Sequence, residues 1–182
     1  MENNVVILTF SPRNGGNCAK IAEFINNYHK SDNVSVFAIT ADNFSACRDC
    51  NYECLQPGMI CPQRTHYQLQ VMDSIVNADM VYYILPNFCG QPNANYFVFN
   101  ERSVDYFNLD RALMNKYLAV RKQFIIVSNT ESETFYNAAQ QQTSGKPEML
   151  YLKTSKYGKR STNGDIMDSE AAKADLEAFL SI

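Results

Sequence analysis

Blocks of apolar and polar residues along the chain predict β-strands that alternate with amphipathic helices. Five short apolar runs have the length and composition of buried strands, at 5–10, 34–40, 80–85, 124–127 and 149–152. Segments with apolar residues at helical spacing lie between and after them, at 17–29, 65–77, 93–104, 110–118, 132–142 and 168–180. Strands that alternate with helices in this way form parallel sheets covered by helices on both faces.

This pattern predicts an α/β fold with three layers, in which a five-stranded parallel sheet is doubly wound in the flavodoxin-like order 2-1-3-4-5. We find no internal repeat and no long linker, so residues 1–182 are expected to form one domain with a cysteine-rich loop at 41–64. Ligands of such sheets bind beyond the carboxyl ends of the strands, between strands one and three. The loops at 11–18, 86–93 and 128–134 are therefore the expected site.

Composition narrows the choice of partners. The net charge of −3 disfavours a dedicated nucleic-acid or anionic-membrane binder, which would normally carry a basic patch. No apolar run approaches the length that spans a bilayer, and the first residues lack the features of a signal peptide. We therefore expect a cytoplasmic protein that binds neither nucleic acid nor membrane, with cysteines that are not structural disulfides.

The segment from Ser11 to Cys18 joins the first predicted strand to the first predicted helix. A helix that begins after a glycine-containing loop presents backbone N–H groups and the positive end of its dipole to an anion. Ser11, Arg13 and Asn17 would add side-chain donors suited to a phosphate monoester. We predict a phosphate site here, while an ordinary strand-to-helix turn with the same residues is the alternative.

The spacing fits neither the dinucleotide fingerprint nor the Walker A loop. Residues 10–18 resemble instead the first phosphate loop of the flavodoxin-like NAD(P)H-dependent FMN reductases, roughly G-S-P-R-x-x-G-N-[ST]. The matching residues are Ser11, Pro12, Arg13, Gly16 and Asn17, while Phe10 replaces the first Gly and Cys18 replaces the final hydroxyl residue. The resemblance implies that Ser11, Arg13, Asn17 and Cys18 hold the phosphate of FMN.

A second segment, 85–94, is similar to the S-P-V-Y-F-G-S-x-S-A loop of the same family, which leads to a helix ending in F-x-D-R. In this chain the helix would end near 99–102. The resemblance implies that this loop and the one after the fourth strand frame the flavin ring. The implied residues are Pro86, Asn87, Phe88, Cys89 and Gly90, followed by Ser128, Asn129 and Thr130. A generic turn is the alternative for either loop.

Four of the six cysteines are closely spaced, as Cys47, Cys50, Cys54 and Cys61. Four thiolates can hold a [4Fe–4S] cluster or a tetrahedral zinc ion. The spacing is similar to the C-x2-C-x2-C-x5-C motif of the iron–sulfur flavoproteins, with one additional residue in each later gap. A cluster, zinc, and free thiols that form a reversible disulfide are all compatible with this pattern.

The resemblance implies an FMN-dependent oxidoreductase that takes a hydride from NAD(P)H, or electrons from a cluster or a ferredoxin-type donor. It would pass them to a small-molecule acceptor, and it would act as a homodimer. No residue is assigned as an acid, base or nucleophile, because the flavin would supply the chemistry. Two alternatives are a non-enzymatic FMN and iron–sulfur electron carrier, and a flavodoxin-like binding module without flavin.

Overall fold

The computed structural model describes residues 2–182. Its strands are β1 (Asn4–Thr9), β2 (Asn33–Ala38), β3 (Met80–Phe88), β4 (Gln91–Pro92), β5 (Arg121–Val127) and β6 (Glu148–Leu152). Its α-helices are α1 (Asn17–Tyr28), α2 (His66–Val76), α3 (Ala94–Phe107), α4 (Arg111–Ala119), α5 (Glu133–Gln140) and α6 (Glu170–Leu180). Short 3₁₀ turns occur at Glu53–Leu55, Thr154–Tyr157 and Ile166–Asp168. No helix among residues 2–182 is long and apolar enough to cross a membrane.

The predicted parallel sheet is present, with the strand order β2-β1-β3-β5-β6. The five predicted strands thus follow one another in space as expected, and the numbering shifts because the two-residue strand β4 pairs antiparallel with the end of β3. The register places Val5 beside both Val34 and Met80, so that β1 lies in the interior of the sheet. The site expected between β1 and β3 lies at their carboxyl ends.

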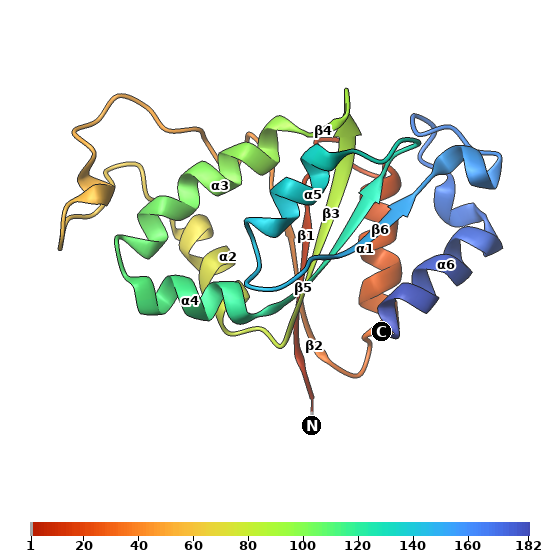
Figure 1. Ribbon diagram of the computed structural model, residues 1–182, viewed down its shortest axis with the longest axis horizontal. Coiled ribbons are helices and arrows are strands. Elements are labelled where there is room, and N and C mark those ends of the chain that lie inside the picture. Colours follow the sequence, from red (N-terminus) through yellow and green to blue (C-terminus); the bar gives the residue numbers. More distant parts are fainter. Residues whose placement is uncertain (1) are drawn as a thin grey trace.

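Helices cover both faces of the sheet (Figure 1). Helices α1 and α6 lie on one face, and α2, α3, α4 and α5 lie on the other. Successive residues of β1 alternate between the two cores: Val6 and Leu8 pack on one face, and Val5 and Ile7 on the other. Burial of each such side chain contributes about 1.5–3 kcal/mol. This explains why the central strands are apolar at nearly every position.

The predicted ends of one strand and one helix are wrong. We expected Pro86 to end the third strand, but β3 continues to Phe88, and Pro86 pairs in register with Val127. The chain then reverses through a two-residue turn at Cys89 and Gly90, whose φ angles are 54° and 82°. Positive φ at both positions is the geometry of the tight hairpins that match the twist of paired strands. The next helix, α3, ends at Phe107 rather than near 102–104, where Asn108 adopts a left-handed conformation.

Candidate functional site

The loop after β1 and the end of β3 enclose a cavity of about 200 Å³ at the carboxyl edge of the sheet. Its lining comprises Ser11, Pro12, Arg13, Gly16, Asn17, Cys18, Pro86, Asn87, Phe88, Val127, Ser161 and Thr162. The first ten come from the predicted loops and the ends of β3 and β5, because the strand order brings these ends together. The last two come from a segment that the sequence did not implicate.

The electrostatics of this cavity favour an anion. Arg13 is the one charged residue of its lining, and its guanidinium forms no ion pair with any of residues 2–182. Helix α1 begins at the cavity after Gly16, without a side-chain cap and without an acidic residue in its first turn. The backbone N–H groups of that turn and the helix dipole therefore add to the positive potential.

Two of the predicted phosphate-binding side chains are used elsewhere. The Asn17 amide donates to the carbonyl oxygen of Ser161 at 3.0 Å and accepts from the backbone N–H of Ile166 at 3.1 Å. Cys18 packs in the core beneath α1, where burial raises the pKa of its thiol to about 12. One of the two amide hydrogens of Asn17 and its carbonyl oxygen are thus engaged by the protein, and the role of Asn17 at a phosphate stays a prediction. The backbone N–H groups of both residues still begin the helix at the cavity.

Phe10, which replaces a glycine of the family pattern, does not crowd the cavity. Its ring is fully buried and packs against Tyr83, Tyr96 and Phe99 with centroids 5.6–5.8 Å apart. The large side chain therefore belongs to the core under α3, and the polar turn begins one residue later, at Ser11.

The hairpin of β3 and β4 borders a second cavity of about 440 Å³. Its lining comprises Pro12, Phe88, Cys89, Gln91, Pro92, Asn93, Ala94 and Asn95, so it shares Pro12 and Phe88 with the first cavity. The Phe88 side chain is 55% exposed. An apolar ring and two prolines beside an anion site provide a surface on which a flat heterocycle attached to a phosphate could lie.

Asn93 leaves an unpaired polar atom at this second cavity. Its side-chain amide donates to the carbonyl oxygen of Phe10 at 2.5 Å, while its Oδ1 is buried and has no hydrogen-bond partner among residues 2–182. Asn93 precedes α3 as its N-cap without capping it. Since a buried unpaired acceptor costs about 1–3 kcal/mol, a ligand N–H group that reached it would be stabilised.

The loop after β5 is tied to both neighbouring loops. Asn87 donates to Ser128 Oγ at 2.6 Å, and the Asn87 carbonyl oxygen Oδ1 accepts from the N–H of Gly90 at 2.8 Å. The Asn129 side chain accepts from Thr154 Oγ1 and from the N–H of Ser155, both at 2.9 Å. The structure thus brings the second and third predicted loops together. Their roles in binding a ring stay predictions, and these side chains serve first to hold the loops.

The cysteine loop gives no support to the predicted metal centre. Within residues 2–182, no three His, Cys, Asp or Glu side chains lie close enough together to bind one metal ion. Cys47 and Cys61 both lie near Arg102 Nη1, at 3.6 and 3.5 Å, while Cys50 and Cys54 are half-buried. The buried guanidinium of Arg102 therefore occupies the position beside these two sulfur atoms.

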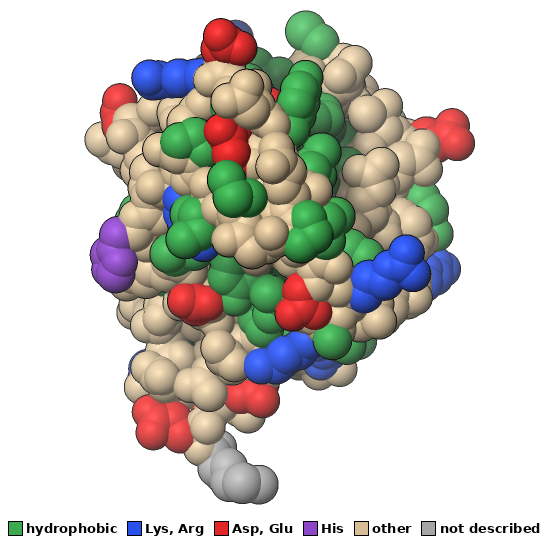
Figure 2. Space-filling view, turned by 90° about the vertical axis from the view of Figure 1, so that its left-hand side faces the viewer, with side chains coloured by type: hydrophobic (Ala, Val, Ile, Leu, Met, Phe, Trp, Pro, Cys, Tyr) green, Lys and Arg blue, Asp and Glu red, His purple; other side chains and the backbone are tan. Residues whose placement is uncertain are grey.

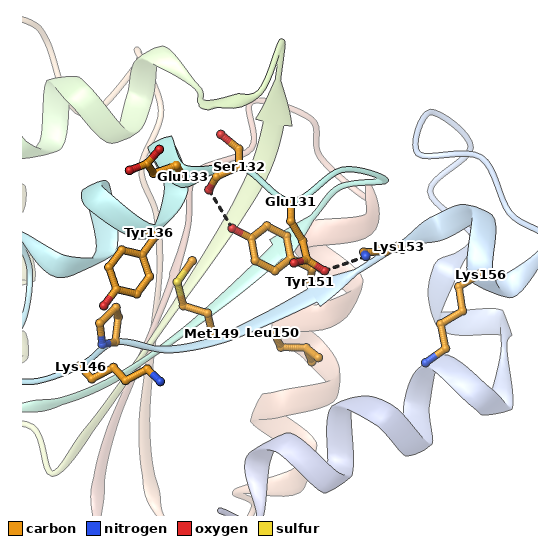
Figure 3. Close-up of a pocket in the computed structure, with 11 residues that line it drawn as sticks. Glu131, Ser132, Glu133, Tyr136, Lys146, Met149, Leu150, Tyr151, Lys153 and Lys156 are labelled. Carbon is orange, nitrogen blue, oxygen red and sulfur yellow. Dashed lines mark hydrogen bonds and ion pairs between the residues drawn. The ribbon is translucent and has the colours of Figure 1, made fainter.

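A larger cavity, of about 900 Å³, lies along the outer edge of β6 beside α5 (Figure 3). None of the residues that the family resemblance implies in phosphate or ring binding lines it, although Glu131, Ser132 and Glu133 belong to the expected loop at 128–134. Lys153 is ion-paired with Glu131 at 2.7 Å, and the Tyr151 hydroxyl donates to the carbonyl oxygen of Ser132 at 3.2 Å. Its lining mixes two carboxylates, Glu131 and Glu133, with three lysines, of which Lys153 and Lys156 are ion-paired. This mixture gives it a weaker preference for an anion than the smaller cavity, which holds Arg13 and no carboxylate.

No family model and no curated protein matches the chain. Solved structures match over its whole length. A Streptococcus mutans protein has a TM-score of 0.68 at 14% identity, over 98% of this chain and 99% of its own. A putative quinone reductase from Klebsiella pneumoniae has a TM-score of 0.63 at 13% identity, over 99% of this chain and 84% of its own. The Paracoccus denitrificans flavoenzyme FerB, an NAD(P)H:acceptor oxidoreductase, has a TM-score of 0.58 at 12% identity, over 98% of this chain and 96% of its own. These likenesses and the strand order show that the chain has the flavodoxin-like fold.

Proposed function

We propose that the chain is an FMN-dependent oxidoreductase that accepts a hydride from NAD(P)H. The observation that carries this proposal is the cavity at the carboxyl ends of β1 and β3. Its lining contains both Arg13, which has no ion-pair partner among residues 2–182, and the uncapped start of α1. Solved structures of the same fold include proteins named as a quinone reductase and as an NAD(P)H:acceptor oxidoreductase.

The residues fit a flavin mononucleotide in three respects. The cavity beside Arg13 suits its phosphate, because the lining holds a guanidinium and no carboxylate. The adjoining cavity with Phe88 suits its ring. The orphaned Oδ1 of Asn93 suits an N–H donor, which the ring of a flavin carries.

The flavin would supply the redox chemistry, accepting a hydride and returning electrons to a second substrate. The chain's own residues would bind and orient. Arg13 and the first turn of α1 would neutralise the phosphate, and the Cys89–Gly90 turn would place Phe88 against the ring. The bonds from Asn87 to Ser128 and Gly90 would keep the second loop rigid. No step requires a protein acid or base.

The test is anaerobic reduction of the FMN-loaded protein by NADH or NADPH, followed as loss of the flavin absorption bands. Reduction at a rate well above that of free FMN supports the proposal. A protein that retains FMN but is reduced by neither nicotinamide would instead be an electron carrier. Iron and sulfide analysis of the same sample tests the [4Fe–4S] cluster, for which residues 2–182 offer no assembled ligand set.

The proposal includes a small-molecule electron acceptor and a second copy of the chain as partners. Apolar side chains gather on the face formed by the cysteine loop, α3 and α4 (Figure 2), where Leu55, Val104, Phe107, Leu109 and Met114 line a groove of about 260 Å³. Exposed apolar surface of this kind is commonly covered by a protein partner. Light scattering on the eluting protein tests the dimer, and Leu109→Glu should dissociate it.

A further inference from the structure

We infer that Ser161 and Thr162 are phosphate-binding residues, so that the anion site is completed by a segment near the end of the chain. The inference rests on the proposed function, because the phosphate concerned is that of FMN. It goes beyond it in assigning the site to two separate parts of the sequence. The loop after β1 would supply Arg13 and backbone N–H groups, and residues 158–165 would supply two hydroxyl groups.

The segment is held against the phosphate loop by specific contacts. Asn17 binds the carbonyl oxygen of Ser161 and the N–H of Ile166, at 3.0 and 3.1 Å, and is itself 6% exposed. A Cβ atom on Gly164 would lie 3.4 Å from the carbonyl oxygen of Gly15 and 3.5 Å from Cα of Gly16. The two backbones therefore pass each other in contact, and this contact fixes residues 161 and 162 at the cavity wall.

The two hydroxyl groups are available to a ligand. Ser161 and Thr162 both line the cavity and are exposed, and neither hydroxyl has a hydrogen-bond partner among residues 2–182. The Ser128 hydroxyl, by contrast, donates to the carbonyl oxygen of Thr130. Ser11 Oγ accepts from the N–H of Arg13 at 3.2 Å and keeps its own hydrogen free to donate.

The chemistry of the site calls for such donors. A phosphate monoester carries a charge of about −1.5 to −2 at neutral pH and three strong acceptor oxygens. One Asn17 amide hydrogen is donated to Ser161 and the Cys18 thiol is buried in the core, so these two side chains supply fewer donors than the family pattern implies. Ser161 and Thr162 lie far from Arg13 in sequence but line the same cavity, and their hydroxyls would supply the additional donors.

The experiment compares FMN with riboflavin, which has the same ring and ribityl chain but no phosphate. Both are titrated into the wild-type protein and into Ser161→Ala/Thr162→Val, with quenching of flavin fluorescence as the readout. The double variant loses two hydrogen bonds to a charged group, so it should weaken FMN binding at least about a hundredfold. Riboflavin binding should not change. Ser155→Ala, an exposed residue of the neighbouring turn that does not line the cavity, is the matched control.

Each outcome decides one point. A wild-type protein that prefers FMN, with the preference lost in the double variant and kept in Thr162→Ser, supports the inference. A preference that survives in the double variant overturns it and leaves the proposed function standing. Equal loss of FMN and riboflavin in the double variant also overturns it, because the hydroxyls would then shape the site rather than bind phosphate. A wild-type protein that binds neither flavin overturns both. Urea unfolding of each variant confirms that it folds.

Discussion

Replacing Asn17 by Ala should destabilise the fold, because the Asn17 side chain bridges α1 to a segment more than 140 residues later. The change removes the bonds to the Ser161 carbonyl and the Ile166 N–H. Ile166 is fully buried, so its N–H loses its partner without gaining water, at about 1–3 kcal/mol, while the more exposed carbonyl of Ser161 adds about 0.5–1.5 kcal/mol. The expected loss is about 1.5–4.5 kcal/mol, or about 3–18 °C in Tm for a chain of this size.

Urea unfolding monitored by circular dichroism measures this loss. Asn33→Ala is the control, since Asn33 makes one exposed side-chain bond, to Asn4 Oδ1 at 2.9 Å, and should change stability by less than about 0.5 kcal/mol. Asn17→Asp keeps an acceptor for Ile166 but places a carboxylate at the anion site, so it should lose less stability and more FMN affinity than Asn17→Ala. If Asn17→Ala were as stable as Asn33→Ala, the bridge would not hold the two segments together.

Three further predictions concern single residues. Gly164→Ala should cost more stability than Gly158→Ala, since both glycines have positive φ but only Gly164 faces backbone atoms within 4 Å; equal losses in urea unfolding would contradict the contact with the phosphate loop. Burial lowers the pKa of Lys122 to about 7, so the unfolded chain binds its proton more tightly, and stability should rise between about pH 7 and 10, by at most about 1.4 kcal/mol per pH unit. Lys122→Met should flatten that rise, and an unchanged slope would refute the assignment. Cys18 should react with a thiol reagent only on unfolding, because its thiol is buried with a pKa of about 12, while Cys47 and Cys89 should react at once; mass spectrometry of the labelled peptides distinguishes them.

Most of the fold follows from local sequence signals. The apolar strands and amphipathic helices have the periods that the structure shows, and the strand order follows from the topology of doubly wound sheets. Two features escape that reasoning. Pro86 can stay within β3, and Cys89 can adopt a positive φ that is typical of Asn or Gly, because the β4 hairpin and the bonds of Asn87 hold the turn. Such tertiary support leaves no mark in the residues themselves.

The sequence predicts the loops that follow the central strands as parts of the site, but not the segment near the end of the chain. The loop at Ser11–Cys18 lies at the cavity as expected, because the strand order places it there. The direction of individual side chains was not predictable: Asn17 turns to Ser161, and Cys18 turns into the core. Ser161 and Thr162 lie in a polar, glycine-containing stretch that reads as an ordinary loop. Long-range contacts bring them to the site: the bonds of Asn17 to Ser161 and Ile166, and the packing of Gly164 against Gly15 and Gly16.

The most direct test of the central claim is whether the protein binds FMN at the cavity beside Arg13. The purified protein is mixed with FMN, passed through a desalting column and examined by visible absorption, with Arg13→Ala as the comparison. We predict that the wild-type protein leaves the column with flavin bands at about one FMN per chain, and that Arg13→Ala retains much less. A colourless wild-type protein, or equal retention by Arg13→Ala, would contradict the assignment of this cavity as a flavin phosphate site.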